Sequence, residues 1–319
     1  MCAIFGLIDY GKVFNSLQRE RIIHALSVEC EIRGTDATGF AFNSGGRLRI
    51  FKRPIPASSL SVRLCEDANI ILGHTRMTTQ GDQKFNYNNH PFYGKAGETN
   101  FALAHNGIIY NDEILRKELN LPIIKIETDS YVAVQILEKF GKLSEKSLAE
   151  MAEKISGSFV FTLLDERNNS YFVRGNNPLA LYKFKAGFYI YASTEAILEG
   201  ALKGLGLAKY PHEKIKTDCG DILKIDKDGN LSRSTFDISE SDCYTVRSFD
   251  WSKLYNGESQ EAWQLKNFAN TIGIDSEDID LLLDCGYDPD EIAELIYEPL
   301  AFQEAVYMAM ECCYGEAFR

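Results

Sequence analysis

The order of strand-like and helix-like segments is the feature that most constrains the fold of this chain. Apolar runs of strand length form two blocks, at residues 4–9, 39–43, 48–51, 70–75 and 101–105, and at 158–165, 170–174, 180–184, 187–192 and 221–226. Helical periodicity covers residues 17–31, and three further helix-like segments follow one another between the blocks, at 112–119, 129–141 and 145–155. A regular strand–helix–strand repeat would alternate throughout. The pattern therefore predicts an α+β fold in which sheets pack together with helices outside them.

The last third of the chain differs in charge. Residues 227–319 carry 20 acidic and 6 basic side chains, so the whole negative balance of the chain lies there. Lys227-Asp228-Gly229-Asn230 is typical of a turn, and residues 232–241 are polar. We therefore expect a domain over residues 2–226, a linker over 227–245 and an acidic helical module over 246–319.

Helix start and stop signals recur within this last part. Asp275 predicts the start of a helix that ends near Asp284, before Cys285-Gly286. Asp288 followed by Pro289 predicts a second start, and a third helix is expected at about 300–312. The expected core of the module consists of its large apolar side chains, namely Trp251, Trp263, Phe268 and residues 281–283.

Composition and charge exclude several classes of protein. Of 319 residues, 45% are hydrophobic and 25% are charged, as in ordinary globular proteins. No apolar run approaches the length of about 18 residues that a membrane-spanning helix requires. The net charge of −12 argues against nucleic acid or an anionic membrane as the main partner. The eight cysteines form no CxxC pair and no secretory signal is visible, which together indicate reduced thiols and a cytoplasmic location.

Cys2 is the residue best suited to covalent chemistry. If the initiator Met1 is removed, Cys2 carries both a thiol and a free α-amine. The amine has an ordinary pKa of about 7.7–8.0 and is a usable base near neutral pH, and the thiolate is a strong nucleophile. The alternative is that Cys2 is a small buried apolar residue beside Ile4 and Phe5. A retained Met1 would block the chemistry.

Six short motifs, in a fixed order, add to this observation. They are Cys2-Ala3-Ile4-Phe5-Gly6, Arg33-Gly34-Thr35-Asp36-Ala37-Thr38-Gly39, residues 73–81, Asn89-His90-Pro91-Phe92, His105-Asn106-Gly107-Ile108-Ile109 and Thr128-Asp129-Ser130. Each motif alone is typical of a turn or a helix cap. In this order, and with cysteine at position two, the set resembles the glutaminase domain of the class II glutamine amidotransferases. This family includes the glutaminase halves of glucosamine-6-phosphate synthase and of glutamine phosphoribosylpyrophosphate amidotransferase.

The resemblance implies a fold and a reaction. The expected fold is the N-terminal-nucleophile hydrolase sandwich, with four layers in the order αββα, followed here by a small C-terminal helical module. Cys2 is expected to attack the side-chain amide of glutamine, to release ammonia and to form a γ-glutamyl thioester that water hydrolyses. The Asn106 side chain and the Gly107 backbone N–H are expected to stabilise the oxyanion.

The matching positions also imply how glutamine is bound. Arg76 is expected to bind the α-carboxylate, Asp129 to pair with the α-ammonium and Thr79 to contact the substrate. Arg33 and Asp36 lie in a motif near the site, where they either contact substrate or form a structural ion pair.

The chain departs from the family pattern at three positions. Met77 stands where an aromatic residue is common, Gln80 where the glucosamine-type enzymes have histidine, and Tyr131 where an acid is common. None of these removes an expected catalytic group, but Met77 lies in the loop expected to close over the substrate.

The sequence contains no signal for a cofactor or a metal. His74, His90 and His105 come from different motifs and lack the spacing of a helical metal site, so we expect them to orient loops. No glycine-rich phosphate loop occurs.

Three hypotheses of function remain open. The chain is a glutaminase subunit that passes ammonia to a separate synthase partner, an amidohydrolase acting on glutamine or a γ-glutamyl compound with water as acceptor, or a non-catalytic binding protein on the same fold. The acidic C-terminal module is either a structural cap or a docking module for a synthase.

Overall fold

The computed structural model describes residues 2–238, 265–266, 269, 274–296 and 299–314. The chain divides into two compact units, Met1–Tyr244 and Thr245–Arg319, which we treat separately. Trp251, Trp263 and Phe268 lie outside the described residues.

The first unit contains two antiparallel sheets. The first sheet has seven strands in the order β11 (His212–Lys214), β9 (Ala180–Phe184), β10 (Phe188–Ala192), β1 (Ala3–Ile8), β4 (Ile70–Arg76), β2 (Ala37–Ser44) and β3 (Arg47–Arg53). The second has six strands in the order β13 (Leu231–Thr235), β12 (Asp221–Ile225), β8 (Ser170–Arg174), β7 (Gly157–Asp165), β6 (Thr99–Ile109) and β5 (Phe92–Ala96).

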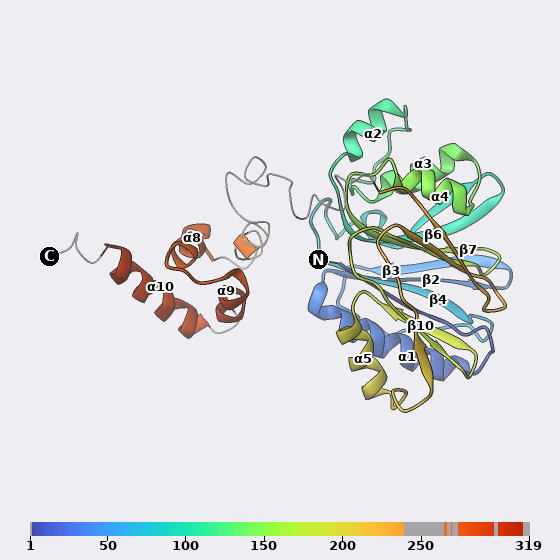
Figure 1. The fold of residues 1–319 in the computed structure, drawn as a ribbon, viewed down its shortest axis with the longest axis horizontal. Helices are drawn as coiled ribbons and strands as arrows, with labels where there is room; N and C mark the ends of the chain where they lie inside the picture. Colours follow the sequence, from blue (N-terminus) through green and yellow to red (C-terminus); the bar gives the residue numbers. More distant parts are fainter. Residues whose placement is uncertain (1, 239–264, 267–268, 270–273, 297–298, 315–319) are drawn as a thin grey trace. The chain divides into compact units, whose positions relative to one another are not determined.

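Helices cover the outer faces of both sheets (Figure 1). Helices α1 (Ser16–Glu29) and α5 (Glu195–Gly204) pack on the seven-stranded sheet. Helices α3 (Tyr131–Phe140) and α4 (Glu145–Ala152) pack on the six-stranded sheet, and α2 (Asp112–Glu118) packs against α3. Within residues 2–238 there are also three short 3₁₀ helices: η1 (Cys30–Arg33), η2 (Ala57–Ser59) and η3 (Asn86–Asn88). The predicted four-layer αββα sandwich is confirmed.

Strand β1 lies between two apolar cores. Ile4 and Ile8 belong to the core between the sheets, whereas Phe5 and Leu7 belong to the core beneath α1 and α5. Because side chains alternate across a strand, a strand buried on both faces must be apolar at every position. This explains the continuous apolar run at the start of the chain.

Three strands and one α-helix of the first unit were not expected from the sequence. They are β5, β11, β13 and α5. The linker predicted over residues 227–245 needs a correction. Residues 231–235, inside that interval, form strand β13, which pairs with β12. Four of the five residues of this edge strand are polar, and none is buried. A strand at the edge of a sheet needs few apolar side chains, so its composition resembled that of a linker.

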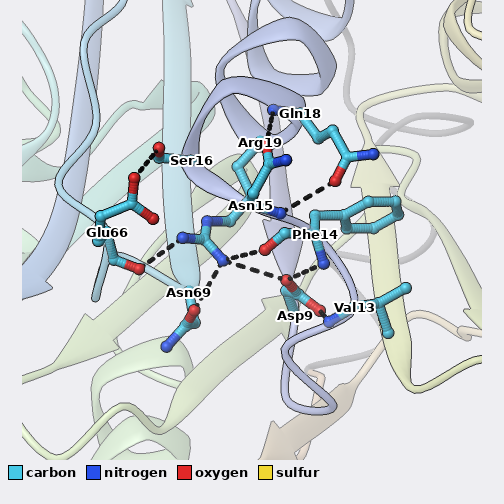
Figure 2. A network of polar contacts seen from close by, with 9 residues as sticks. All are labelled: Asp9, Val13, Phe14, Asn15, Ser16, Gln18, Arg19, Glu66 and Asn69. Atoms are coloured by element: carbon cyan, nitrogen blue, oxygen red, sulfur yellow. Dashed lines mark hydrogen bonds and ion pairs between the residues drawn. The ribbon is translucent and has the colours of Figure 1, made fainter.

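A buried arginine fixes the start of α1 to neighbouring loops (Figure 2). Arg19 donates to Asp9 Oδ2 at 3.4 Å and to Asn69 Oδ1 at 2.9 Å, and it also donates to the carbonyls of Phe14 and Glu66. Asp9 in turn accepts the backbone N–H groups of Val13 and Phe14. Because Asp9 directly follows β1 and Asn69 directly precedes β4, the network joins these adjacent strands to the helix that covers them.

The second unit contains three described helices: α8 (Ser276–Asp284), α9 (Pro289–Ile296) and α10 (Pro299–Tyr314). The Asp275 side chain caps α8 by accepting the Glu277 N–H, as the sequence predicted. Leu282 lies in the core of this unit, with Leu281 and Leu283 packed against it.

Candidate functional site

Strand pairing brings several of the expected site residues together. In the ladder between β1 and β4, Ala3 pairs with Thr75, so Cys2 directly precedes β1 at the end where β4 finishes with Arg76. The ladder between β2 and β4 pairs Ala37 with Arg76, which brings the segment before β2 to the same edge. Residues separated by up to 75 positions in sequence therefore meet at one end of the seven-stranded sheet.

Cys2 is half-buried and is held by contacts on both sides. Its Sγ donates to the Met77 carbonyl at 3.4 Å, and its own carbonyl accepts from Arg33 Nε at 3.0 Å. Burial raises the pKa of the Cys2 thiol, whereas the Met77 contact and the nearby charge of Arg76 lower it and Asp129 raises it.

Arg76 is almost fully buried and organises the loop that follows it. Its Nη1 donates to Asn89 Oδ1 at 2.7 Å, and its Nη2 donates to the carbonyls of Gln80 and Gly81 at 2.6 and 2.8 Å. Burial lowers the pKa of the guanidinium, and the opposing charges of Cys2, Asp36 and Asp129 raise it. Three of its five N–H groups are thus used within the protein.

Asp36 also holds the loop that follows Arg76. Its backbone N–H donates to the Arg76 carbonyl at 2.9 Å, and its Oδ2 accepts the Thr78 N–H at 2.6 Å. Gly34 lies against the same segment, since an added Cβ would come within 2.4 Å of the Arg76 carbonyl carbon. Thr79 is exposed in this loop. The observed contacts of Asp36 therefore position the loop.

Asn106 and Gly107 lie in β6 of the other sheet. Asn106 is fully buried, with Nδ2 3.4 Å from Ser193 Oγ, and its carbonyl accepts from Asn177 Nδ2 at 2.9 Å. Gly107 has a φ of 147°, and an added Cβ would lie 1.8 Å from the Ser158 carbonyl oxygen. Only glycine fits there, because the backbone geometry and the close approach both exclude a side chain.

Asp129 is buried just before α3 and tied to β6. Its Oδ2 accepts the Ile109 N–H at 2.7 Å, and its Oδ1 accepts the Ser130 hydroxyl at 3.1 Å. Ser130 Oγ also lies 2.8 Å from His105 Nδ1. The carboxylate is therefore held in a fixed orientation by backbone and side-chain donors.

The three histidines from separate motifs form one buried cluster. His74 Nε2 lies 3.0 Å from the His105 carbonyl, and the rings of His74 and His90 stack with centroids 4.2 Å apart. Burial is the main cause that lowers the pKa of His74 to about 3, and it also lowers the pKa values of His90 and His105. The cluster is therefore uncharged at neutral pH. Among the described residues, no group of three or more histidine, cysteine or acidic side chains is arranged to hold a metal ion.

Comparison with known proteins identifies the domain. Residues 74–199 match the family model described as a glutamine amidotransferase domain. These residues belong to a glutamine amidotransferase domain.

Curated relatives of this amidotransferase domain carry the same name in several bacteria. The glutamine–fructose-6-phosphate aminotransferases of Staphylococcus epidermidis and Geobacillus kaustophilus are 31% and 30% identical over 202 residues, which cover 60% of this chain and 32% of theirs. The Staphylococcus aureus protein is 28% identical over 257 residues, covering 76% of this chain and 40% of its own. The chain thus matches about a third of the length of these relatives.

Solved structures agree on the fold. The glutamine phosphoribosylpyrophosphate amidotransferase of B. subtilis superposes with a TM-score of 0.58 at 18% identity, over 75% of this chain and 50% of that one. A structure titled as the allosteric regulatory enzyme of purine biosynthesis gives a TM-score of 0.60 at the same identity and coverage.

Among the described residues, no helix is both long and apolar enough to cross a membrane.

Several residues of the amidotransferase site had no role assigned from the sequence. Ser193 and Asn177 contact Asn106, and Asn89 contacts Arg76. Lys52 donates to the carbonyls of Asn89 and Pro91. Asn89 belongs to one of the six motifs, but only its contact with Arg76 shows what it does.

Proposed function

We propose that this domain hydrolyses the side-chain amide of glutamine with Cys2 as the nucleophile, after removal of Met1. The observation that carries the proposal is the geometry of the two sheets: Cys2 directly precedes β1 where the paired strand β4 ends at Arg76, and Ser193 contacts both Ile4 of β1 and Asn106 of β6 in the other sheet. Asp129 is held against the same strand β6 by the Ile109 N–H. Together these residues would supply a nucleophile, donors for the oxyanion and charges that bind the two α-substituents of glutamine.

The reaction begins with transfer of the thiol proton of Cys2 to its own α-amine. The thiolate attacks the amide carbon of glutamine, and the Asn106 side chain and the Gly107 N–H donate to the oxyanion of the tetrahedral intermediate. The C–N bond then breaks and ammonia leaves with the proton from the α-amine. Water attacks the γ-glutamyl thioester, gives up a proton to the amine, and releases glutamate and the free thiol.

The ends of glutamine would be recognised by opposite charges. Arg76 pairs with the α-carboxylate through the N–H groups that the protein leaves available, and Asp129 pairs with the α-ammonium. Thr79 contacts the substrate from the loop 77–81, and Arg33 and Asp36 position Cys2 and that loop. Both α-substituents are then recognised, which favours free glutamine over an internal glutamine of a peptide.

The raised pKa of Cys2 gives the site a built-in restraint. A thiol kept protonated by burial is a poor nucleophile until a base removes its proton. The free α-amine created by loss of Met1 supplies that base at the same residue. Processing of the N-terminus is therefore the step that activates the site.

We further propose that the ammonia is passed to a separate synthase. The matched relatives are named aminotransferases, and the region that this chain matches covers 32% of their length. The acidic second unit, Thr245–Arg319, is the candidate for docking this partner.

Intact mass and glutamate release test the proposal. The purified chain should lack the mass of one methionine and should release glutamate and ammonia from glutamine. Cys2→Ala should abolish release, whereas Cys65→Ala, which removes an exposed free thiol, should not. Retention of Met1 in an active protein, or unchanged activity in Cys2→Ala, would exclude Cys2 as the nucleophile. Activity that rises only when a synthase is added would favour the ammonia-transfer role over plain hydrolysis.

A further inference from the structure

Ser193 connects the strand of the nucleophile to the strand of the oxyanion donor. It lies directly after β10, fully buried, and its Oγ accepts the Ile4 N–H at 2.9 Å. Ile4 is two residues from Cys2 on β1. The same Oγ lies 3.4 Å from the Asn106 side-chain amide on β6. One hydroxyl therefore contacts both sheets beside the proposed site.

The hydrogen bonds around Ser193 bear on how the Asn106 amide is turned. A serine hydroxyl has one proton to donate. The Ser193 Oγ accepts the Ile4 N–H at 2.9 Å, and its proton is directed at the Ile4 carbonyl over a long distance of 3.5 Å. The described structure leaves Asn106 Oδ1 buried without a partner, and an unsatisfied buried acceptor is unfavourable. The nitrogen and oxygen of an amide have nearly the same shape, so the hydrogen-bond network is what distinguishes them.

Turning the amide by half a rotation gives Asn106 Oδ1 a partner, in place of the 3.5 Å contact between the Ser193 hydroxyl and the Ile4 carbonyl. Asn106 Oδ1 then accepts the Ser193 hydroxyl proton, while Ser193 Oγ continues to accept the Ile4 N–H. The Asn106 nitrogen becomes the atom without a protein partner. A donor intended for a transient oxyanion must be free in this way before the reaction begins.

We propose that Ser193 is a positioning residue that holds the Asn106 amide with its nitrogen free to donate to the oxyanion. Asn177 complements it from the other side, since its Nδ2 donates to the Asn106 carbonyl and fixes the backbone. The inference rests on the proposed glutaminase function, because it assigns the role of Ser193 through Asn106.

Kinetics of Ser193→Ala test the proposal. Without the hydroxyl, the amide loses the bond that selects its orientation, and we expect kcat to fall about 10- to 100-fold while KM changes less than about twofold. Alkylation of Cys2 by iodoacetamide should keep its wild-type rate, because displacement of iodide forms no oxyanion. Ser193→Thr keeps the hydroxyl and should recover activity relative to Ser193→Ala.

Two further variants separate positioning from general damage. Ser27→Ala removes another fully buried hydroxyl, which donates to the His24 carbonyl within α1, and should leave kcat unchanged. Asn106→Ala should cost at least as much as Ser193→Ala, and the double variant should be no worse than Asn106→Ala alone. Wild-type kcat in Ser193→Ala, or losses that add in full in the double variant, would overturn the inference.

Neutron diffraction on deuterated wild-type crystals gives an answer that needs no turnover. Deuterons on the Asn106 atom that faces away from Ser193 would support the proposal. Deuterons on the atom that faces Ser193 would refute it, even in an active enzyme. An inactive wild-type protein with the supported orientation would instead count against the glutaminase function alone.

Discussion

The buried histidine cluster should make the first unit lose stability as the pH falls below about 6.5. An unfolded histidine has a pKa near 6.5, whereas burial holds the pKa of His74 at about 3 and that of His90 well below its ordinary value. Below about pH 6.5 the unfolded chain therefore binds protons that the folded chain does not. Stability falls wherever the unfolded state binds more protons as pH decreases.

The size of this effect follows from the unfolded-state titration. A histidine that stays neutral in the folded state and has an ordinary pKa when unfolded costs about 2 kcal/mol between pH 7 and pH 5. His74 and His90 both meet this condition, and the pKa of His105 is shifted in the same direction. The total loss is thus a large part of the stability of a folded domain, which is on the order of 10 kcal/mol.

His90→Phe isolates one member of the cluster. The described structure leaves both ring nitrogens of His90 buried without a partner, and its ring stacks on His74 and lies 4.3 Å from the Phe92 ring. Phenylalanine keeps an aromatic ring and removes the titration. The free energy of unfolding, measured with urea at pH 7, 6 and 5, should therefore fall by about 2 kcal/mol less in His90→Phe than in wild type. His24→Gln, at an exposed position of α1, controls for loss of a histidine as such. An equal fall in wild type and His90→Phe would refute the reasoning.

Three other predictions follow from the described contacts. Gly107→Ala should abolish glutamate release and lower the free energy of unfolding by about 1–3 kcal/mol, because the new Cβ would meet the Ser158 carbonyl; wild-type activity would contradict this. Arg19→Met should cost about 3–5 kcal/mol in urea unfolding, since it leaves Asp9 buried without its cation, and adding Asp9→Asn should recover part of the loss. Burial lowers the pKa of Lys52 from 10.5 to about 8, so between these values the unfolded chain holds a proton that the folded chain has lost. Wild type should therefore gain stability relative to Lys52→Met as the pH rises across that window, and parallel pH profiles would show that Lys52 is not desolvated.

The layers of the first unit could be predicted because buried strands and helices produce recognisable patterns of apolar residues in the sequence. The apolar run of β1 and the helical period of α1 are local patterns, and each is visible in the amino-acid sequence alone. The edge strand β13 shows no such pattern, because none of its residues is buried and it pairs with a strand on one side only. The same reasoning explains why its residues were assigned to a linker.

Site residues divide in a similar way. Cys2, Arg76 and Asp129 have side chains that carry the required chemistry wherever they stand, and the ordered motifs placed them in one family. Their roles in catalysis remain proposals that the kinetic experiments test. Asp36 shows the limit of this reasoning, since the sequence left its role open and the fold gives it the Thr78 N–H as a partner.

The sequence by itself determined most of the order of strands and helices, the position of a cysteine directly before the first strand and the acidic character of the last third. Only the tertiary structure decided that Ser193 would meet both Ile4 and Asn106, which lie 189 and 87 residues away along the chain. A hydrogen bond depends on distance and direction to within a few tenths of an ångström. Such contacts are set by how the two sheets pack, and no local pattern in the chain records them.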